Sequence, residues 1–170
     1  MIWRILIFGF CLIMGLLALF ASPGETDGNV LSYTSSEDTT CLAKNIYFEA
    51  RSESTAGRIA VAHTVLNRVR DEGFPNTICG VIYQGIKNER GNPKRDKCQF
   101  SWYCDGKPDI ITDIRVWRES FRLANYVTTG RDYLLDITDG SLFYHATYVS
   151  PRWAKYKRKT VQIDTHIFYR

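Results

Sequence analysis

The sequence lacks the short motifs that mark several large enzyme classes. It has no HExxH pair of zinc-binding histidines, no GxxxxGK[S/T] phosphate-binding loop and no GxGxxG dinucleotide fingerprint. It has no CxxC pair, and its three histidines lie far from its cysteines along the chain. Because carboxylates are not clustered either, we expect neither a metal ion nor another cofactor.

Internal repeats are also absent, and the composition excludes further classes. Hydrophobic residues make up 45% of the 170 residues, and charged residues make up 24%. That balance excludes a disordered chain, a collagen-like repeat and a polytopic membrane protein. A chain of this length predicts one domain with its own hydrophobic core.

Charge is absent from an apolar run near the N-terminus. Ile5–Ala21 contains no charged residue and, as a helix, would be about 25 Å long, close to the thickness of a bilayer core. Arg4 precedes the run and acidic residues follow it, which predicts that the rest of the chain lies outside the cytoplasm. We expect residues 1–21 to be a signal anchor that holds the protein in the membrane through residues 5–21. A cleaved signal peptide, which would release the protein, is the alternative, although Leu19 fits a cleavage site poorly.

Basic residues are absent from the next segment and abundant after it. Residues 22–40 carry four acidic residues and no Lys or Arg, which predicts a flexible acidic linker. Residues 41–170 carry 21 basic and 14 acidic residues, a net charge of +7 that favours an anionic partner. Export argues against nucleic acid, so we interpret the basic runs 87–97 and 155–159 as solvated faces or contacts to an anionic wall polymer. We expect no obligate protein partner.

Four of the five cysteines lie in the predicted domain. An even number in an exported domain permits two disulfides, with three possible pairings. The short spacing of Cys98 and Cys104 would close a small loop and leave Cys41 to pair with Cys79. Buried free thiols are the alternative.

The periodicity of apolar residues predicts a helix-dominated α+β domain with a small antiparallel sheet, preceded by an N-terminal apolar helix. We expect helices from Thr39 or Thr40 to about Ser52, and over about 55–71, 78–84 and 114–128. Between them we expect a polar basic loop over 87–97 and a short extended segment over 99–103. Thr160–Ile163 and His166–Tyr169 are predicted to form a hairpin around Asp164 and Thr165.

One carboxylate falls on an apolar helical stripe. Glu49 shares a helical face with Leu42 and Ile46. Burial raises the pKa of a carboxyl group, which keeps a general acid protonated near neutral pH. The alternatives are an ion pair between Glu49 and a neighbouring basic group, or a solvated edge of the stripe. Glu53, one turn later, is a weaker candidate.

Two later segments combine aromatic rings with polar groups, a mixture that suits a sugar-binding groove but also occurs in protein cores. The candidate substrate-binding residues are Gln99, Phe100, Ser101, Trp102, Tyr144, His145 and Tyr148. His145 is a candidate base, but no Ser or Cys nucleophile motif accompanies it. His63 and His166 are interpreted as packing residues.

The segments CLAKNIYFEAR, GRIAVAHTVLNRV, FPNTICGVIYQ, CQFSWYCDG and YHATYVSPRWA occur in this order. Together they resemble the bacterial and phage cell wall hydrolase family typified by the spore-cortex lytic enzyme SleB, over nearly all of residues 41–170. The resemblance implies a lysozyme-like lytic transglycosylase fold and cleavage of the bond between N-acetylmuramic acid and N-acetylglucosamine in peptidoglycan. It implies that Glu49 is the catalytic acid and that residues 99–102 and 144–149 line the glycan cleft.

The resemblance does not separate a bacterial housekeeping enzyme from a phage endolysin. The peptidoglycan-binding domain that precedes the catalytic domain of the spore enzyme is not found here, so a role in germination is not implied.

A single well-placed carboxylate favours a lytic transglycosylase, because hydrolytic glycosidases generally use two. The sugar's own hydroxyl would be the nucleophile, so no second carboxylate would be required. A hydrolytic muramidase and a non-catalytic wall-binding protein are the alternatives.

Overall fold

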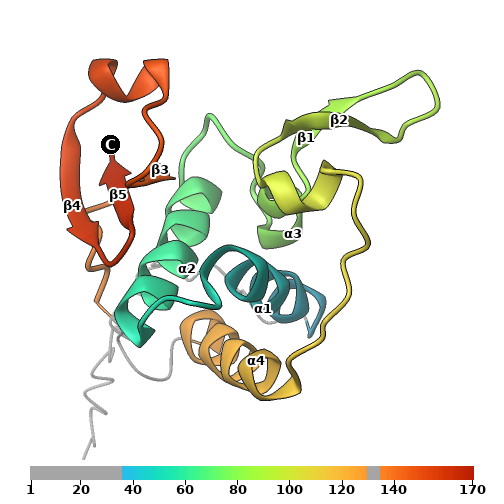
Figure 1. Cartoon of the computed structure of the whole chain (residues 1–170), viewed down its shortest axis with the longest axis horizontal. Helices are drawn as coiled ribbons and strands as arrows, with labels where there is room; N and C mark the ends of the chain where they lie inside the picture. Colours follow the sequence, from blue (N-terminus) through green and yellow to red (C-terminus); the bar gives the residue numbers. More distant parts are fainter. Residues whose placement is uncertain (1–35, 130–134) are drawn as a thin grey trace, which may run out of the picture. The chain divides into compact units, whose positions relative to one another are not determined.

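The computed structural model describes residues 36–129 and 135–170. Over these residues the fold is α+β and rich in helix, as the sequence predicts (Figure 1). The elements, in chain order, are α1 (Ser36–Ala50), α2 (Thr55–Arg70), α3 (Ile78–Ile82), β1 (Gly85–Lys87), β2 (Pro93–Cys98), η1 (Ser101–Cys104), α4 (Ile114–Thr129), β3 (Phe143–Ala146), η2 (Arg152–Tyr156), β4 (Lys159–Ile163) and β5 (His166–Tyr169).

The hydrophobic core lies between the helices. α1 packs most extensively against α4 and also contacts α2 and α3. The largest fully buried aliphatic side chains come from α1, α2 and α3: Leu42, Ile46, Val61, Val65, Leu66, Ile78, Val81 and Ile82. Burying one such side chain stabilises the fold by about 1.5–3 kcal/mol, so this cluster holds the helices in place.

The helix starts follow capping rules only in part. Ser54 caps α2, because its hydroxyl accepts a hydrogen bond from the Gly57 N–H at 3.2 Å. Thr39 and Thr40, which we expected to be caps, lie inside α1. The Thr39 hydroxyl instead lies 3.1 Å from the hydroxyl of Thr128 in α4, so it ties two helices together within the core.

The C-terminal residues form a three-stranded antiparallel sheet with the strand order β3-β5-β4. The predicted hairpin of β4 and β5 is confirmed, and Asp164 has a φ of 47° in its turn. β3 was not predicted as a strand. It pairs with β5 so that Tyr144 lies opposite Phe168, and this pairing orients residues that the sequence could assign only to an aromatic cluster.

Two local predictions were wrong. The basic segment 87–97 is not a loop, because β1 and β2 pair there as an antiparallel hairpin. Its turn is closed by Asn88, whose carbonyl accepts from the Gly91 N–H at 2.9 Å and whose side chain accepts from the Asn92 N–H at 3.0 Å. Residues 99–103 are not extended, because the 3-10 helix η1 occupies Ser101–Cys104.

The predicted apolar helix and signal segment, residues 1–21, lie outside the described residues. Of the predicted linker, residues 36–40 are helical and belong to α1. Within the described ranges, no helix is both long enough and apolar enough to cross a membrane.

Two disulfides join the cysteines in the pairing that the spacing suggested. Cys41 of α1 is bonded to Cys79 of α3, which links two helices of the core. Cys98 is bonded to Cys104, which fixes the base of the β1–β2 hairpin to the end of η1.

The two disulfides are expected to contribute unequally to stability. Chain-entropy arguments give about 4 kcal/mol for a bond that closes a separation of 38 residues and about 2 kcal/mol for a separation of 6. Replacing Cys41 and Cys79 with Ser should therefore lower the free energy of unfolding more than replacing Cys98 and Cys104. Urea titration of the two double variants measures this, and a larger loss from the Cys98 and Cys104 variant would contradict it.

Candidate active site

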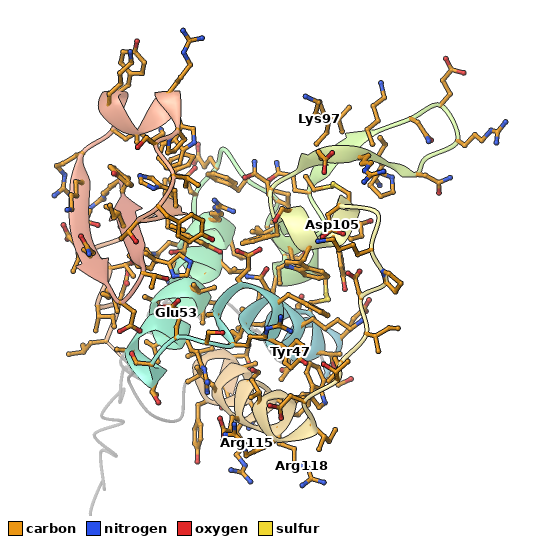
Figure 2. The ribbon with its side chains drawn as sticks, in the orientation of Figure 1. Tyr47, Glu53, Lys97, Asp105, Arg115 and Arg118 are labelled. Atoms are coloured by element: carbon orange, nitrogen blue, oxygen red, sulfur yellow. A yellow bond between two sulfur atoms is a disulfide. The ribbon has the colours of Figure 1, made fainter. Side chains whose placement is uncertain are left out.

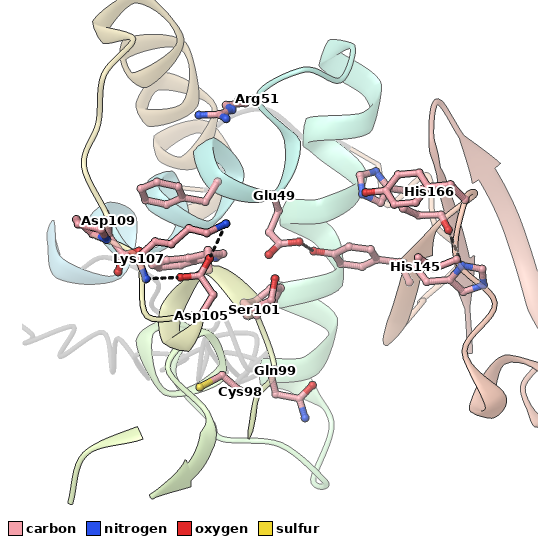
Figure 3. A pocket seen from close by; sticks show the side chains of 18 of the residues that line it. Glu49, Arg51, Cys98, Gln99, Ser101, Asp105, Lys107, Asp109, His145 and His166 are labelled. Atoms are coloured by element: carbon pink, nitrogen blue, oxygen red, sulfur yellow. Dashed lines mark hydrogen bonds and ion pairs between the residues drawn. The ribbon is translucent and has the colours of Figure 1, made fainter. Parts of the chain in front are cut away.

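A groove of about 740 Å³ lies where the helices, η1 and the C-terminal sheet meet (Figure 3). All of the predicted catalytic and substrate-binding residues line it: Glu49, Gln99, Phe100, Ser101, Trp102, Tyr144, His145 and Tyr148. They come from the end of α1, from η1 and the two residues before it, and from β3 and the segment after it. The fold thus brings together three clusters that are far apart in the sequence.

Glu49 lies near the C-terminal end of α1, one turn after the fully buried Ile46. Figure 3 shows its carboxyl group pointing into the groove. The carboxyl oxygen Oε2 accepts a hydrogen bond of 3.0 Å from the Tyr144 hydroxyl. Among the described residues Glu49 forms no ion pair within 4.0 Å, so the alternative of a structural salt bridge is wrong.

Opposing effects act on the pKa of Glu49. Burial raises it, because the anion loses hydration, while the Tyr144 hydrogen bond and the positive charge of Arg68 lower it. Burial is the largest effect, so the pKa lies above its ordinary value. Glu49 therefore remains a proton donor to a higher pH than an exposed carboxyl group does.

Two rings of β5 hold Tyr144 in place. Its edge-to-face contact with His166 has a centroid distance of 5.1 Å, and Phe168 lies at 5.5 Å. Burial and the neighbouring Glu49 raise the pKa of Tyr144 well above 10.0. The phenol therefore stays protonated and acts as a fixed hydrogen-bond donor to Glu49.

Arg68 is a groove residue that the sequence analysis missed. It lies in α2 and is only 5% exposed. Its Nε donates to the Leu142 carbonyl oxygen at 2.7 Å, and its guanidinium lies 5.2 Å from the ring centroids of both Phe74 and Phe100. The available signal was an arginine between Leu66 and Val69 on a buried stripe, where an unpaired charge is costly.

The histidines and Glu53 make contacts within the fold. Both ring nitrogens of His145 are engaged, one 2.9 Å from the Ala146 carbonyl oxygen and the other 2.9 Å from the Tyr169 hydroxyl. His63 is buried in α2, and His166 packs on Tyr144. Glu53 does not line the groove. It accepts hydrogen bonds from the N–H and the hydroxyl of Thr165, at 3.1 and 2.6 Å, and so fixes the turn between β4 and β5.

Comparison with known proteins assigns the chain to a family. A sequence profile described as Cell Wall Hydrolase matches residues 52–169. The chain belongs to the cell wall hydrolase family. The matched residues begin after Glu49, so this match does not include that residue.

The curated relatives of this cell wall hydrolase include spore cortex-lytic enzymes. That of Bacillus cereus is 40% identical over 62 residues, which are 36% of this chain and 24% of the relative. That of Bacillus subtilis is 42% identical over 52 residues, which are 31% of this chain and 17% of the relative. The chain thus spans about a quarter or less of the length of these relatives.

Two solved structures resemble this cell wall hydrolase over most of its length. The catalytic domain of the Bacillus cereus SleB protein aligns with a TM-score of 0.56 at 26% identity, over 80% of this chain and 91% of that one. The catalytic domain of the germination-specific lytic transglycosylase SleB from Bacillus anthracis aligns with a TM-score of 0.58 at 26% identity, over 80% and 96%. The fold is therefore that of the SleB catalytic domain.

The predicted sugar-contacting residues of the cell wall hydrolase differ in exposure. Gln99, Ser101 and Tyr148 are exposed along the groove. Phe100 and Trp102 are 2% and 8% exposed and belong largely to the core. The Trp102 indole stacks on Phe48 at 4.9 Å and donates to the Asn45 side chain at 3.1 Å. Phe100 and Trp102 therefore shape the groove floor more than they offer ring faces to a ligand.

Two acidic residues in the groove were also missed by the sequence analysis. Asp105 and Asp109 follow η1 and line the groove with Lys107 (Figure 3). The Asp105 carboxylate accepts the Lys107 N–H at 2.8 Å and lies 3.9 Å from its ammonium group. Burial and the neighbouring Asp105 raise the pKa of Asp109. The sequence signal was a turn motif, Asp-Gly-Lys-Pro-Asp, that predicts only a loop.

The hydrogen bond from Tyr144 is expected to influence the pKa of Glu49. Tyr144→Phe removes a donor that stabilises the anion, so the pKa of Glu49 should rise further above its ordinary value. A carbon-detected NMR titration of the Glu49 carboxyl group measures this in both proteins. Tyr148→Phe is the control, because Tyr148 is 85% exposed and forms no hydrogen bond with Glu49. A fall in the Glu49 pKa of Tyr144→Phe would contradict the prediction.

Proposed function

We propose that this cell wall hydrolase cleaves the bond between N-acetylmuramic acid and N-acetylglucosamine in peptidoglycan, with Glu49 as the general acid. The environment of the Glu49 carboxyl group supports this proposal most directly. The carboxyl group points into a groove, has a raised pKa and forms no ion pair with another described residue. The spore cortex-lytic relatives and the SleB catalytic domains support the same substrate class.

The first step uses the protonated form of Glu49. The carboxyl group donates its proton to the glycosidic oxygen as the bond from that oxygen to the muramic C1 breaks, and the N-acetyl carbonyl oxygen of the same sugar stabilises the positive charge at C1. The Glu49 anion that results is stabilised by the Tyr144 hydroxyl at 3.0 Å and by the charge of Arg68. General acid catalysis of this kind typically contributes about 10²–10⁴-fold to a rate.

The second step distinguishes a lytic transglycosylase from a hydrolase. In the transglycosylase route the Glu49 anion removes the proton of the C6 hydroxyl, and that oxygen bonds to C1 to close a 1,6-anhydro ring. No water is consumed, and Glu49 regains its proton. The nucleophile is part of the substrate, so its effective concentration is high and one carboxyl group suffices.

Hydrolysis is a second candidate, because Asp105 and Asp109 provide further carboxylates in the groove. Asp105 is held by the Lys107 N–H at 2.8 Å and could orient a water molecule for attack on C1. Inverting and retaining glycosidases both use such a second carboxylate. The nature of the product ends therefore separates the two routes.

We also propose that the domain acts outside the cytoplasm, anchored or exported through residues 1–21. The two disulfides support this, since disulfides persist in oxidising compartments. The uncharged run at residues 5–21 supports it at the level of sequence.

Glu49→Gln should abolish lysis of purified peptidoglycan, by at least about 10²-fold, while the fold is retained. Gln keeps the size of the side chain and an oxygen that accepts from Tyr144, but it has no acidic proton. Release of soluble fragments measures the effect, and circular dichroism reports the fold. Glu72→Gln is the matched control, because Glu72 is exposed and does not line the groove. Undiminished lysis by Glu49→Gln would refute its role as the acid, and binding without any release by the unmodified protein would indicate a wall-binding protein.

Mass spectrometry of the fragments should find 1,6-anhydromuramic ends, and Asp105→Asn should leave that product unchanged. The reason is that the transglycosylase route assigns no step to Asp105. Reducing ends that disappear in Asp105→Asn would instead support hydrolysis with Asp105 as the second carboxylate.

A further inference from the structure

A second hollow adjoins the groove at one end. It has a volume of about 370 Å³ and is lined by Gln84, Gly85, Ile86, Lys97, Cys98 and Gln99. Cys98 and Gln99 line both the hollow and the groove. Figure 3 shows these two residues at the end of the groove opposite Arg51. A chain that branches from a glycan in the groove would therefore reach the hollow directly.

The hollow lies along the base of the β1–β2 hairpin, which is firmly fixed there. The Gln99 N–H donates to the Gln84 carbonyl oxygen at 2.9 Å, and Gly85 pairs with Cys98. A Cβ atom at Gly85 would lie 2.9 Å from the Cys98 sulfur, so only glycine fits this close approach. With the disulfide from Cys98 to Cys104, these contacts make the base of the hairpin a rigid wall of the hollow.

The hairpin is strongly basic and exposed. Over residues 85–98 it carries five cationic side chains and two acidic ones, a net charge of +3. Only one pair among them is close, Arg95 and Asp96 at 3.8 Å. Lys94 and Lys97 are exposed (Lys97 is labelled in Figure 2), and their side chains form no hydrogen bond or ion pair with another described residue. Lys97 lines the hollow, and Lys94 lies further along the hairpin, beside Asn88, Glu89 and Arg90. An excess of positive charge on one short hairpin favours an anionic ligand.

The rest of the hollow suits a short peptide. Ile86 is 57% exposed and offers an apolar surface to small side chains. Gln99 is exposed and offers an amide that can donate to and accept from a peptide backbone. The peptide stems of peptidoglycan combine alanine methyl groups, amides and free carboxylates, and they branch from the muramic residues of the strand.

We propose that the hollow and the hairpin form a subsite for the acidic peptide stem of a glycan strand bound in the groove, with Lys94 and Lys97 pairing with its carboxylates. This proposal rests on the proposed function for its choice of glycan. It makes the protein selective for strands that still carry their stems, whereas the groove alone binds the sugars.

The test measures binding separately from cleavage. Full-length Glu49→Gln binds soluble, uncross-linked glycan strands with their stems, and the same strands after an amidase has removed the stems. In this background Lys94→Gln/Lys97→Gln should weaken binding of the stem-bearing strands about five-fold, the value expected for two exposed ion pairs. Binding of the stripped strands should not change. The loss should disappear at high salt, which screens exposed charges.

Two further variants serve as controls. Arg118→Gln/Arg122→Gln removes the same charge from exposed positions on α4 and should not weaken binding of either substrate. Lys94→Arg/Lys97→Arg keeps the charge and should restore the affinity. An equal loss on stem-bearing and stripped strands, or the same loss in the α4 variant, would overturn the proposal in favour of general attraction to an anionic polymer. If the unmodified protein cleaves neither substrate, the proposed function fails, and the ratio of the two affinities still decides whether the stem subsite exists.

Discussion

The hydrogen bond from Tyr144 to Glu49 is the contact on which the candidate active site depends. It joins the end of α1 to β3, across 95 residues of sequence. The carboxyl group therefore acquires its environment only when the helical core and the C-terminal sheet are both folded and in contact. Two further contacts join the same parts, from the Ser54 N–H to Asp164 at 2.8 Å and from Thr165 to Glu53. Glu53 thus positions the sheet against the helices, while Glu49 faces the groove that this arrangement creates.

The helices of the core, the helix periodicity and the hairpin of β4 and β5 could be predicted from the sequence, because each follows from local spacing of apolar residues. β3 could not be predicted, since its residues become a strand only by pairing with β5, as when Tyr144 meets Phe168. The hairpin of β1 and β2 was missed because its exposed, charged residues have no alternation of apolar and polar side chains. Its formation depends on the turn at Asn88 and on the disulfide at its base.

The same distinction applies to the groove. Glu49 could be singled out as a site residue, because a carboxylate that shares a helical face with Leu42 and Ile46 is costly to bury unless it has a partner or a function. The aromatic clusters were predictable as groups, but their exposure was not: Phe100 and Trp102 are buried, and Tyr148 is open to solvent. Asp105 begins an exposed turn directly after η1, and nothing in its neighbourhood along the chain indicates that it lines the same groove as Glu49. Such residues are identified by tertiary structure alone.

Arg68 bears on the proposed route, in which one carboxyl group would serve as both acid and base. A direct ion pair with an arginine would hold Glu49 ionised and remove its proton before the reaction. Arg68 instead donates to the Leu142 carbonyl oxygen and lies among the rings of Phe74 and Phe100, so its charge acts on Glu49 without a direct contact. Burial raises the pKa of Glu49, while Arg68 and the Tyr144 hydroxyl lower it and so would limit the cost of the anion that the proposed proton transfer forms. The free energies of the protonated and ionised forms of Glu49 are therefore closer than they would be with burial alone. A group that donates a proton and later accepts one requires two forms of similar free energy.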